Sequence, residues 1–130
     1  MIRRALPILV LAAAMIAGGV LAVGASGRPS AGAAATKKLT FKASASKLRF
    51  TRGHYIVRHG RFRVTMINPS GASFPHQLEI TRSGKETKTG KLQPGKRGSF
   101  TISLKRGTYQ FYCPVDGHKA AGMKGTITVR

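Results

Sequence analysis

The sequence predicts an all-β domain, either a β-sandwich or a Greek-key barrel of about seven or eight short strands. From Leu39 onward, apolar and polar residues alternate with a period of two, the pattern of strands with one buried face. The alternating runs are separated by Gly, Pro, Asn and Ser, which favour turns. No stretch has the periodicity of a convincing amphipathic helix. The chain of 130 residues has room for one such domain.

The expected strands begin at residues 39–43, where every second residue is apolar. The same apolar phase continues at residues 48–50, and a short run at residues 55–57 follows a glycine turn. Residues 62–66 alternate again, and the sequence NPSG after them predicts another turn.

Two of the later expected strands carry side chains that can bind a metal. In the sequence PHQLEI, His76, Leu78 and Ile80 share one face, so His76 is in phase with the core at the beginning of a strand. Residues 108–113 form another expected strand, in which Cys113 follows the core phase at the C-terminal end. If these strands are antiparallel neighbours, the histidine and the cysteine meet at one end of the domain.

The remaining segments complete the domain. Residues 82–98 are rich in Lys and Gly and are expected to form a solvated loop, with a tight turn at residues 93–95. Residues 99–104 and 126–129 alternate as strands do.

The N-terminal region has the character of an export sequence. Residues 1–27 contain a positive start followed by the apolar run LPILVLAAAMIAGGVLAVGA, which predicts a signal peptide. The run is also close to the ~20 apolar residues that cross a bilayer, so an uncleaved N-terminal membrane anchor is the alternative. Residues 28–38 are small and polar, as in a flexible linker, which leaves residues 39–130 as the folded domain. Either alternative places the domain outside the cytoplasm, secreted, periplasmic or at the cell surface.

The exported part is strongly basic. The chain contains 23 Lys and Arg against 3 Asp and Glu, and of these only Arg3, Arg4 and Arg28 lie within the first 28 residues. Such a charge attracts anionic partners, including an acidic protein or an anionic envelope, and a merely solubilising surface is the plain alternative. Export and the scattered positions of the basic residues argue against nucleic acid.

The sequence FYCPVDGHKAAGM brings three soft metal ligands into one short loop. Cys113, His118 and Met123 offer a thiolate, an imidazole and a thioether. Four residues separate the cysteine from the histidine, and four more separate the histidine from the methionine. With His76 they make a trigonal His₂Cys set with a weak axial methionine, the ligand chemistry of a blue copper site. One Cu(I)/Cu(II) ion is therefore the expected cofactor. Zinc is the competing metal, but its structural sites rarely use methionine.

The alternatives for the single residues are structural. Alone, His76 would be a hydrogen-bonded core histidine, Met123 a packing residue and Cys113 a small buried hydrophobe. Their joint spacing and strand phase favour the metal site. His54 and His59 flank a basic turn and are expected to be surface residues. The backbone N–H of Gln77 is a candidate hydrogen-bond donor to the Cys113 sulfur.

The chain resembles the cupredoxin family, the plastocyanin, azurin and rusticyanin group of small blue copper proteins. The resemblance spans about residues 39–130 and is carried most specifically by Tyr112, Cys113, Pro114, Gly117, His118, Gly122, Met123, Lys124, Gly125 and Val129. The loop before the histidine is longer than in plastocyanin and is more similar to rusticyanin and auracyanin. The resemblance implies a Greek-key β-sandwich, with His76, Cys113, His118 and Met123 as copper ligands.

The resemblance also implies a function. It predicts a monomeric carrier of single electrons between larger redox proteins, with His118 as the electron port inside an apolar patch of Val115, Ala120, Ala121 and Gly122. The alternatives are an exported protein that stores or delivers copper, and a basic module for anionic polymers with a structural metal. An enzyme is not expected, because four protein ligands leave no open metal position and there is no paired carboxylate.

Overall fold

The computed structural model describes residues 34–130, which form eight strands. Along most of these strands buried and exposed residues alternate. In β3, for example, Phe62, Val64 and Met66 are buried while Arg61 and Arg63 are exposed, as the period of two requires. The strands are β1 Lys37–Lys42, β2 His54–Val57, β3 Gly60–Ile67, β4 Glu79–Arg82, β5 Lys85–Lys88, β6 Arg97–Leu104, β7 Gly107–Tyr112 and β8 Lys124–Val129. The signal peptide or anchor predicted for residues 1–27, and the first part of the linker, lie outside the described residues.

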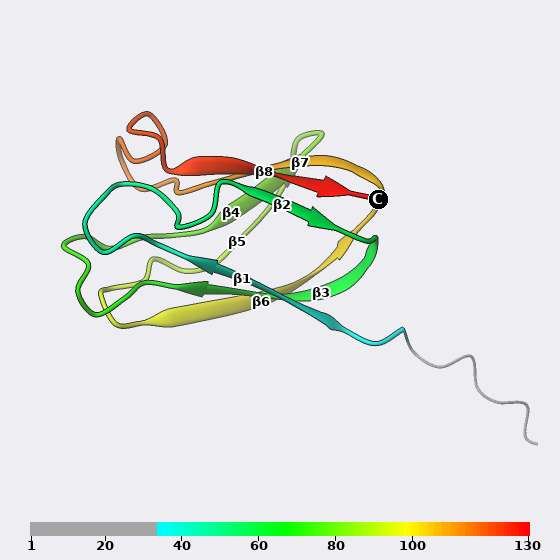
Figure 1. The fold of residues 1–130 in the computed structure, drawn as a ribbon, viewed down its shortest axis with the longest axis horizontal. Coiled ribbons are helices and arrows are strands. Elements are labelled where there is room, and N and C mark those ends of the chain that lie inside the picture. The colour runs from blue at the N-terminus through cyan, green and yellow to red at the C-terminus, as the bar shows by residue number, and fades with distance from the viewer. Residues whose placement is uncertain (1–33) are drawn as a thin grey trace, which may run out of the picture. The chain divides into compact units, whose positions relative to one another are not determined.

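The strands form two sheets that face each other (Figure 1). The three-stranded sheet has the order β1-β3-β6, and the five-stranded sheet has the order β2-β8-β7-β4-β5. The β1–β3 and β2–β8 pairs are parallel and the other pairs are antiparallel. This arrangement confirms the predicted all-β sandwich. Residues 34–130 contain no helix long and apolar enough to cross a membrane.

The core is a single cluster between the sheets. Four aromatic rings, those of Phe41, Phe50, Tyr55 and Phe111, pack with centroids 4.6 to 6.3 Å apart, mostly edge to face. Aromatic pairs of this geometry add to the stabilisation from burial alone. Every strand pair and every residue of the cluster lies between Lys37 and Val129, so the domain has the elements it needs to fold by itself.

The sandwich has two ends with different contents. At one, here the Cys113 end, β7 ends and β8 begins, and the long loops on the left of Figure 1 gather. At the other, here the Lys37 end, β1 and β3 begin while β4, β6 and β8 end. The segment that precedes β1 therefore joins the domain at the Lys37 end, away from Cys113.

Two expectations for the secondary structure were wrong. Residues 82–98 were expected to be a loop, but residues 85–88 form β5, which pairs with β4 through a two-residue turn. Ser83 and Gly84 both have positive φ in this turn, at 50° and 76°, as a type I′ hairpin requires. The polar sequence KETK hid this strand, because an edge strand exposed to water needs no apolar alternation.

The second correction concerns His76, which was expected to begin a strand. It lies before β4 and forms an isolated bridge with Leu92. The ladder between β4 and β7 does not extend to this residue, because the backbone N–H of Gln77 is bonded to the Cys113 sulfur and not to a carbonyl.

Candidate metal centre

The loop between β7 and β8 is fixed by its own backbone. The N–H of Cys113 donates to the carbonyl of Met123 over 3.0 Å, and the N–H of Met123 donates to the carbonyl of His118 over 3.0 Å. Gly117 and Gly122 take the positive φ values, 76° and 106°, that let the chain turn back on itself. The three soft side chains are therefore placed by a closed network, and not by the strand ends alone.

His76 comes from a separate loop that is held equally firmly. Its backbone exchanges two hydrogen bonds with Leu92, at 2.9 and 2.7 Å. The side-chain amide of buried Asn68 donates to the carbonyls of Leu92 and Phe74, over 2.8 and 3.0 Å. Asn68 thus links Phe74, which lies just before His76, to Leu92, the bridge partner of His76. This role of Asn68 was not predicted from the sequence.

The two segments bring three of the predicted ligands together. The Nδ1 atoms of His76 and His118 lie 3.2 Å apart, and the Sγ atom of Cys113 lies 3.5 Å from Nδ1 of His118. Possible ligand atoms of all three residues lie within 4.8 Å of one another, and all three residues are buried. Met123 is fully buried at the end of the same loop. As predicted, β4 and β7 are antiparallel neighbours, which brings His76 and Cys113 to the same end.

The Cys113 sulfur has the predicted backbone partner. The N–H of Gln77 donates to Sγ over 3.3 Å. The side chain of Gln77 donates to the carbonyl of Thr89, and the Thr89 hydroxyl accepts from the N–H of Leu78 over 3.1 Å. The donor to the sulfur is therefore itself held in place on both sides.

Burial sets the protonation of the three groups. Loss of water lowers the pKa of His76, with repulsion from His118 adding to the effect, and it also lowers the pKa of His118, against a smaller opposite effect of Asp116. Both imidazoles are thus neutral at pH 7, the form that binds a metal. Burial raises the pKa of the Cys113 thiol, despite the N–H donor of Gln77, so a metal must displace the thiol proton when it binds.

The donor set fits copper. Two neutral imidazole nitrogens and one sulfur converge in a buried pocket, with a thioether residue buried in the same loop. Nitrogen with soft sulfur is the combination that copper prefers, and a carboxylate, which harder cations would require, is absent from this group of residues.

His118 lies at the surface edge of the cluster. His118 is 7% exposed, against 1% for His76 and 0% for Cys113. In the same loop Ala120, Ala121 and Gly122 are exposed and Val115 is half-buried, the residues predicted to form an apolar patch. The sequence did not point to Phe74, which is 52% exposed and meets the His118 ring edge to face at 6.0 Å. The signal for Phe74 in the sequence was an aromatic residue directly before Pro75 and the predicted ligand His76. His54 and His59 are exposed, as predicted.

A second polar group joins the neighbouring strands β4 and β7, next to Cys113 in the sequence. The Tyr112 hydroxyl donates to the carboxylate of Glu79, which is only 3% exposed, and this bond raises the pKa of Tyr112 to about 12. The Nζ of Lys119 lies 3.8 Å from the centroid of the Tyr112 ring. The hydrogen bond explains how the Glu79 carboxylate is tolerated where water is excluded.

An eight-stranded sandwich with a buried cluster of two histidines and one cysteine at one end defines a class of metal-binding β-sandwich proteins. The chain belongs to the copper-binding proteins of the plastocyanin/azurin family, whose model matches residues 36–130. The family and the donor set together identify one copper ion as the cofactor.

Solved structures with the same fold include copper proteins of different kinds. Auracyanin B aligns with a TM-score of 0.67 at 22% identity, over 72% of this chain and 88% of that protein. Auracyanin from the photosynthetic bacterium Roseiflexus castenholzii aligns with a TM-score of 0.66 at 23% identity, over 74% and 98%. The copper nitrite reductase from Nitrosomonas europaea aligns with a TM-score of 0.56 at 19% identity, over 73% of this chain and 41% of the enzyme. No match was found among curated protein sequences.

Proposed function

We propose that this chain is an exported blue copper protein that carries single electrons between redox proteins. His76, Cys113 and His118 would hold the ion in a trigonal arrangement, and Met123 would supply the weak axial ligand. Copper bound there would alternate between Cu(I) and Cu(II), so that the protein accepts one electron from a donor protein and passes it to an acceptor.

The observation that carries the proposal is the network of backbone hydrogen bonds that holds the ligand residues. Three of them are linked by backbone hydrogen bonds within one loop, and His76 is held by its backbone bridge to Leu92. Ligands held by such a network would keep one geometry in both oxidation states, which reduces the rearrangement that accompanies electron transfer. A protein that releases copper to an acceptor would need the opposite, a loop that opens easily.

The surface around His118 supports the same proposal. Phe74 meets the His118 ring edge to face, and Ala120, Ala121 and Gly122 of the same loop are exposed and uncharged. These four residues, here called the rim, would let a partner approach the His118 ring, although charged Asp116 and Lys119 lie in the same loop. The basic surface outside this rim would favour acidic redox partners, and it would speed their encounter. An enzymatic role is not proposed, because four protein ligands would leave no open metal position for a substrate.

Export of the domain is part of this proposal. Residues 1–27 would direct the chain across the membrane and either be removed or remain as a tether, with residues 28–38 as the linker. Residues 39–130 would then function outside the cytoplasm as a monomer.

Electron self-exchange separates the electron carrier from a protein that stores or delivers copper. Line broadening in NMR spectra of mixed Cu(I) and Cu(II) protein should show fast exchange, and the copper should resist transfer to an added chelator. Slow self-exchange together with ready loss of copper would contradict the proposal. Ala120→Glu, which places a negative charge in the rim, should slow self-exchange, whereas Lys85→Glu at the Lys37 end should have little effect.

A further inference from the structure

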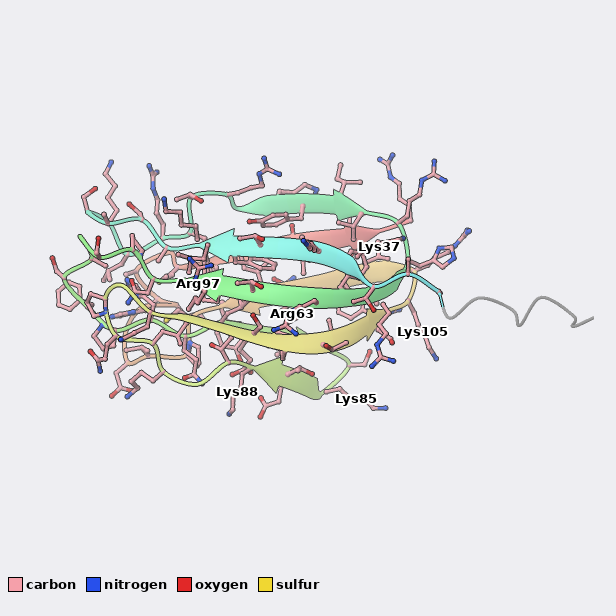
Figure 2. The ribbon with its side chains drawn as sticks, turned by 90° about the horizontal axis from the view of Figure 1, so that it is seen from below. Lys37, Arg63, Lys85, Lys88, Arg97 and Lys105 are labelled. Atoms are coloured by element: carbon pink, nitrogen blue, oxygen red, sulfur yellow. The ribbon has the colours of Figure 1, made fainter. Side chains whose placement is uncertain are left out.

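The Lys37 end of the sandwich carries a group of basic side chains that the copper site does not use. They come from the turns between strands and from the strand ends, and we call them the basic pole: Lys37, Arg58, Arg61, Arg82, Lys85, Lys105 and Arg106. Figure 2 shows Lys37, Lys85 and Lys105 near this end, whereas Arg97 lies toward the other.

Four members of the basic pole share one cleft. Arg82, Lys85, Lys105 and Arg106 line a cleft of about 650 Å³ whose apolar lining includes Ile80 and Ile102. No acidic residue lines this cleft. A neighbouring cleft of about 470 Å³ is lined by Arg58, Arg106 and Arg130, so Arg106 belongs to both. A cleft lined by cationic and apolar side chains suits a ligand in which an anionic group is attached to an apolar part.

Tyr109 holds part of this cleft in place. The Arg82 guanidinium donates to the Tyr109 hydroxyl over 3.2 Å and lies 5.0 Å from the centre of its ring. The same hydroxyl accepts a hydrogen bond from the backbone N–H of Lys105 over 3.0 Å. One buried tyrosine thus orders both an arginine and the turn that carries Lys105 and Arg106, so these cations lose less freedom on binding an anion.

The protein does not neutralise these charges itself. Within residues 34–130 the single ion pair joins Lys88 to Glu86, at 3.8 Å. The other two acids are engaged elsewhere, since Glu79 accepts from Tyr112 and Asp116 lies in the loop of Cys113. The basic pole is therefore available to an external anion.

The chain also enters the domain at this end. If the apolar run of residues 5–27 stays in a bilayer, residues 28–36 are the only connection to β1. If this segment behaves as a flexible chain, its mean reach is roughly 15–18 Å, which would keep the Lys37 end within about two Debye lengths of the lipid surface at physiological salt. The basic pole would then be the part of the domain closest to the lipid headgroups.

We propose that the basic pole binds the anionic phospholipid headgroups of a membrane, with phosphates in the cleft between Arg82 and Arg106. The Lys37 end of the domain would contact the membrane and the Cys113 end would face away from it, so that His118 stays accessible to soluble partners. Nucleic acid fits less well, because neither cleft has an exposed Phe, Tyr or Trp side chain on which bases could stack, and His59 is the one exposed aromatic ring among their lining residues. The proposal depends on export, but the binding itself does not depend on copper.

Vesicle sedimentation with residues 34–130, which contain every described strand, tests the proposal without the apolar run. The domain should bind vesicles of equal parts phosphatidylglycerol and phosphatidylcholine, should not bind phosphatidylcholine alone, and should dissociate as salt is raised. The variant Arg82→Gln/Lys85→Gln/Lys105→Gln/Arg106→Gln should bind at least tenfold more weakly, because it removes four of the basic residues that would face the anionic surface.

A matched variant, Lys47→Gln/Arg49→Gln/Lys91→Gln/Arg97→Gln, removes the same charge from exposed positions in the loop after β1, in the loop before β6 and at the start of β6. These segments lie toward the Cys113 end, as Figure 2 shows for Arg97. It should keep most of the affinity. Equal losses in the two variants would overturn the proposal, because binding would then follow net charge alone, and so would tighter binding to duplex DNA than to the anionic vesicles. Lys85→Gln/Lys105→Gln/Arg106→Gln, which leaves the Arg82–Tyr109 contact intact, should reproduce most of the loss if the first variant folds poorly.

Discussion

The backbone N–H of Gln77 points at the sulfur of Cys113 across 3.3 Å and links the two segments that supply the predicted ligands. A hydrogen bond to a thiolate stabilises negative charge on the sulfur, and that charge is larger when the bound copper is reduced. The bond should therefore raise the reduction potential of the site.

Gln77→Pro removes this N–H and should lower the potential. If the bond favours the reduced state by about 1 kcal/mol, the fall is on the order of 40 mV. Voltammetry of the copper-loaded protein measures it. Gln77→Ala is the control, because it keeps the N–H and loses only the side-chain bond to Thr89. Equal potentials for the proline and alanine variants would show that the N–H has no effect.

Met123→Leu should preserve the blue colour and raise the potential. The thioether would be a weak donor that stabilises Cu(II) more than Cu(I), so its loss would favour the reduced state. Met123 is fully buried, and leucine has a similar volume, so the free energy of unfolding of the apoprotein should change by less than about 1.5 kcal/mol. An unchanged potential would remove Met123 from the set of ligands.

The apoprotein should lose stability on both sides of neutral pH. His76 and His118 have lowered pKa values in the folded state, so the unfolded chain binds more protons as the pH falls below 6.5, and unfolding becomes easier. Cys113 has a raised pKa, so its contribution is present below the ordinary value of 9.0 and is lost as the pH rises beyond it.

Urea unfolding of the apoprotein between about pH 5 and pH 10 measures both effects. His76→Asn/His118→Asn should flatten the acidic side and leave the alkaline side in place. A double variant that loses stability below pH 6.5 as steeply as the parent would show that other groups cause the acid effect.

Gly125→Ala should destabilise the domain. A Cβ atom at this position would run into the carbonyl group of Gly53 and the ring of Phe111, where β8 pairs with β7. Overpacking of this kind costs about 1–3 kcal/mol of the free energy of unfolding. Gly53→Ala, whose Cβ would meet nothing within 4 Å, should change stability by less than about 0.5 kcal/mol. Similar melting temperatures for the two variants would contradict the packing at Gly125.

Alternation predicted the fold well where a strand has one buried face. Tyr109, Phe111 and Cys113 are all buried, as their phase requires, and the antiparallel contact of β4 with β7 follows the expected arrangement. The exposed hairpin strand β5 could not be found in this way, because neither of its faces is strongly apolar. Its signal was the turn at Ser83 and Gly84.

The site could be predicted because its side chains are chemically unusual, and its supports could not. Cys113, His118 and Met123 are recognisable by type and spacing. Asn68, Phe74 and Glu79 are common residues whose roles depend on which chain segments lie beside them, such as the carbonyls of Leu92 and Phe74 for Asn68. Tertiary contacts of that kind leave no pattern in a single sequence.

The optical and paramagnetic-resonance spectra of the protein after addition of Cu(II) test the central claim most directly. The proposed site predicts an intense blue thiolate-to-copper absorption and a narrow copper hyperfine splitting. Cys113→Ala should remove both, and His59→Ala, which changes an exposed histidine outside the cluster, should leave them unchanged. A colourless product with an ordinary wide hyperfine splitting would contradict a blue copper centre at His76, Cys113, His118 and Met123.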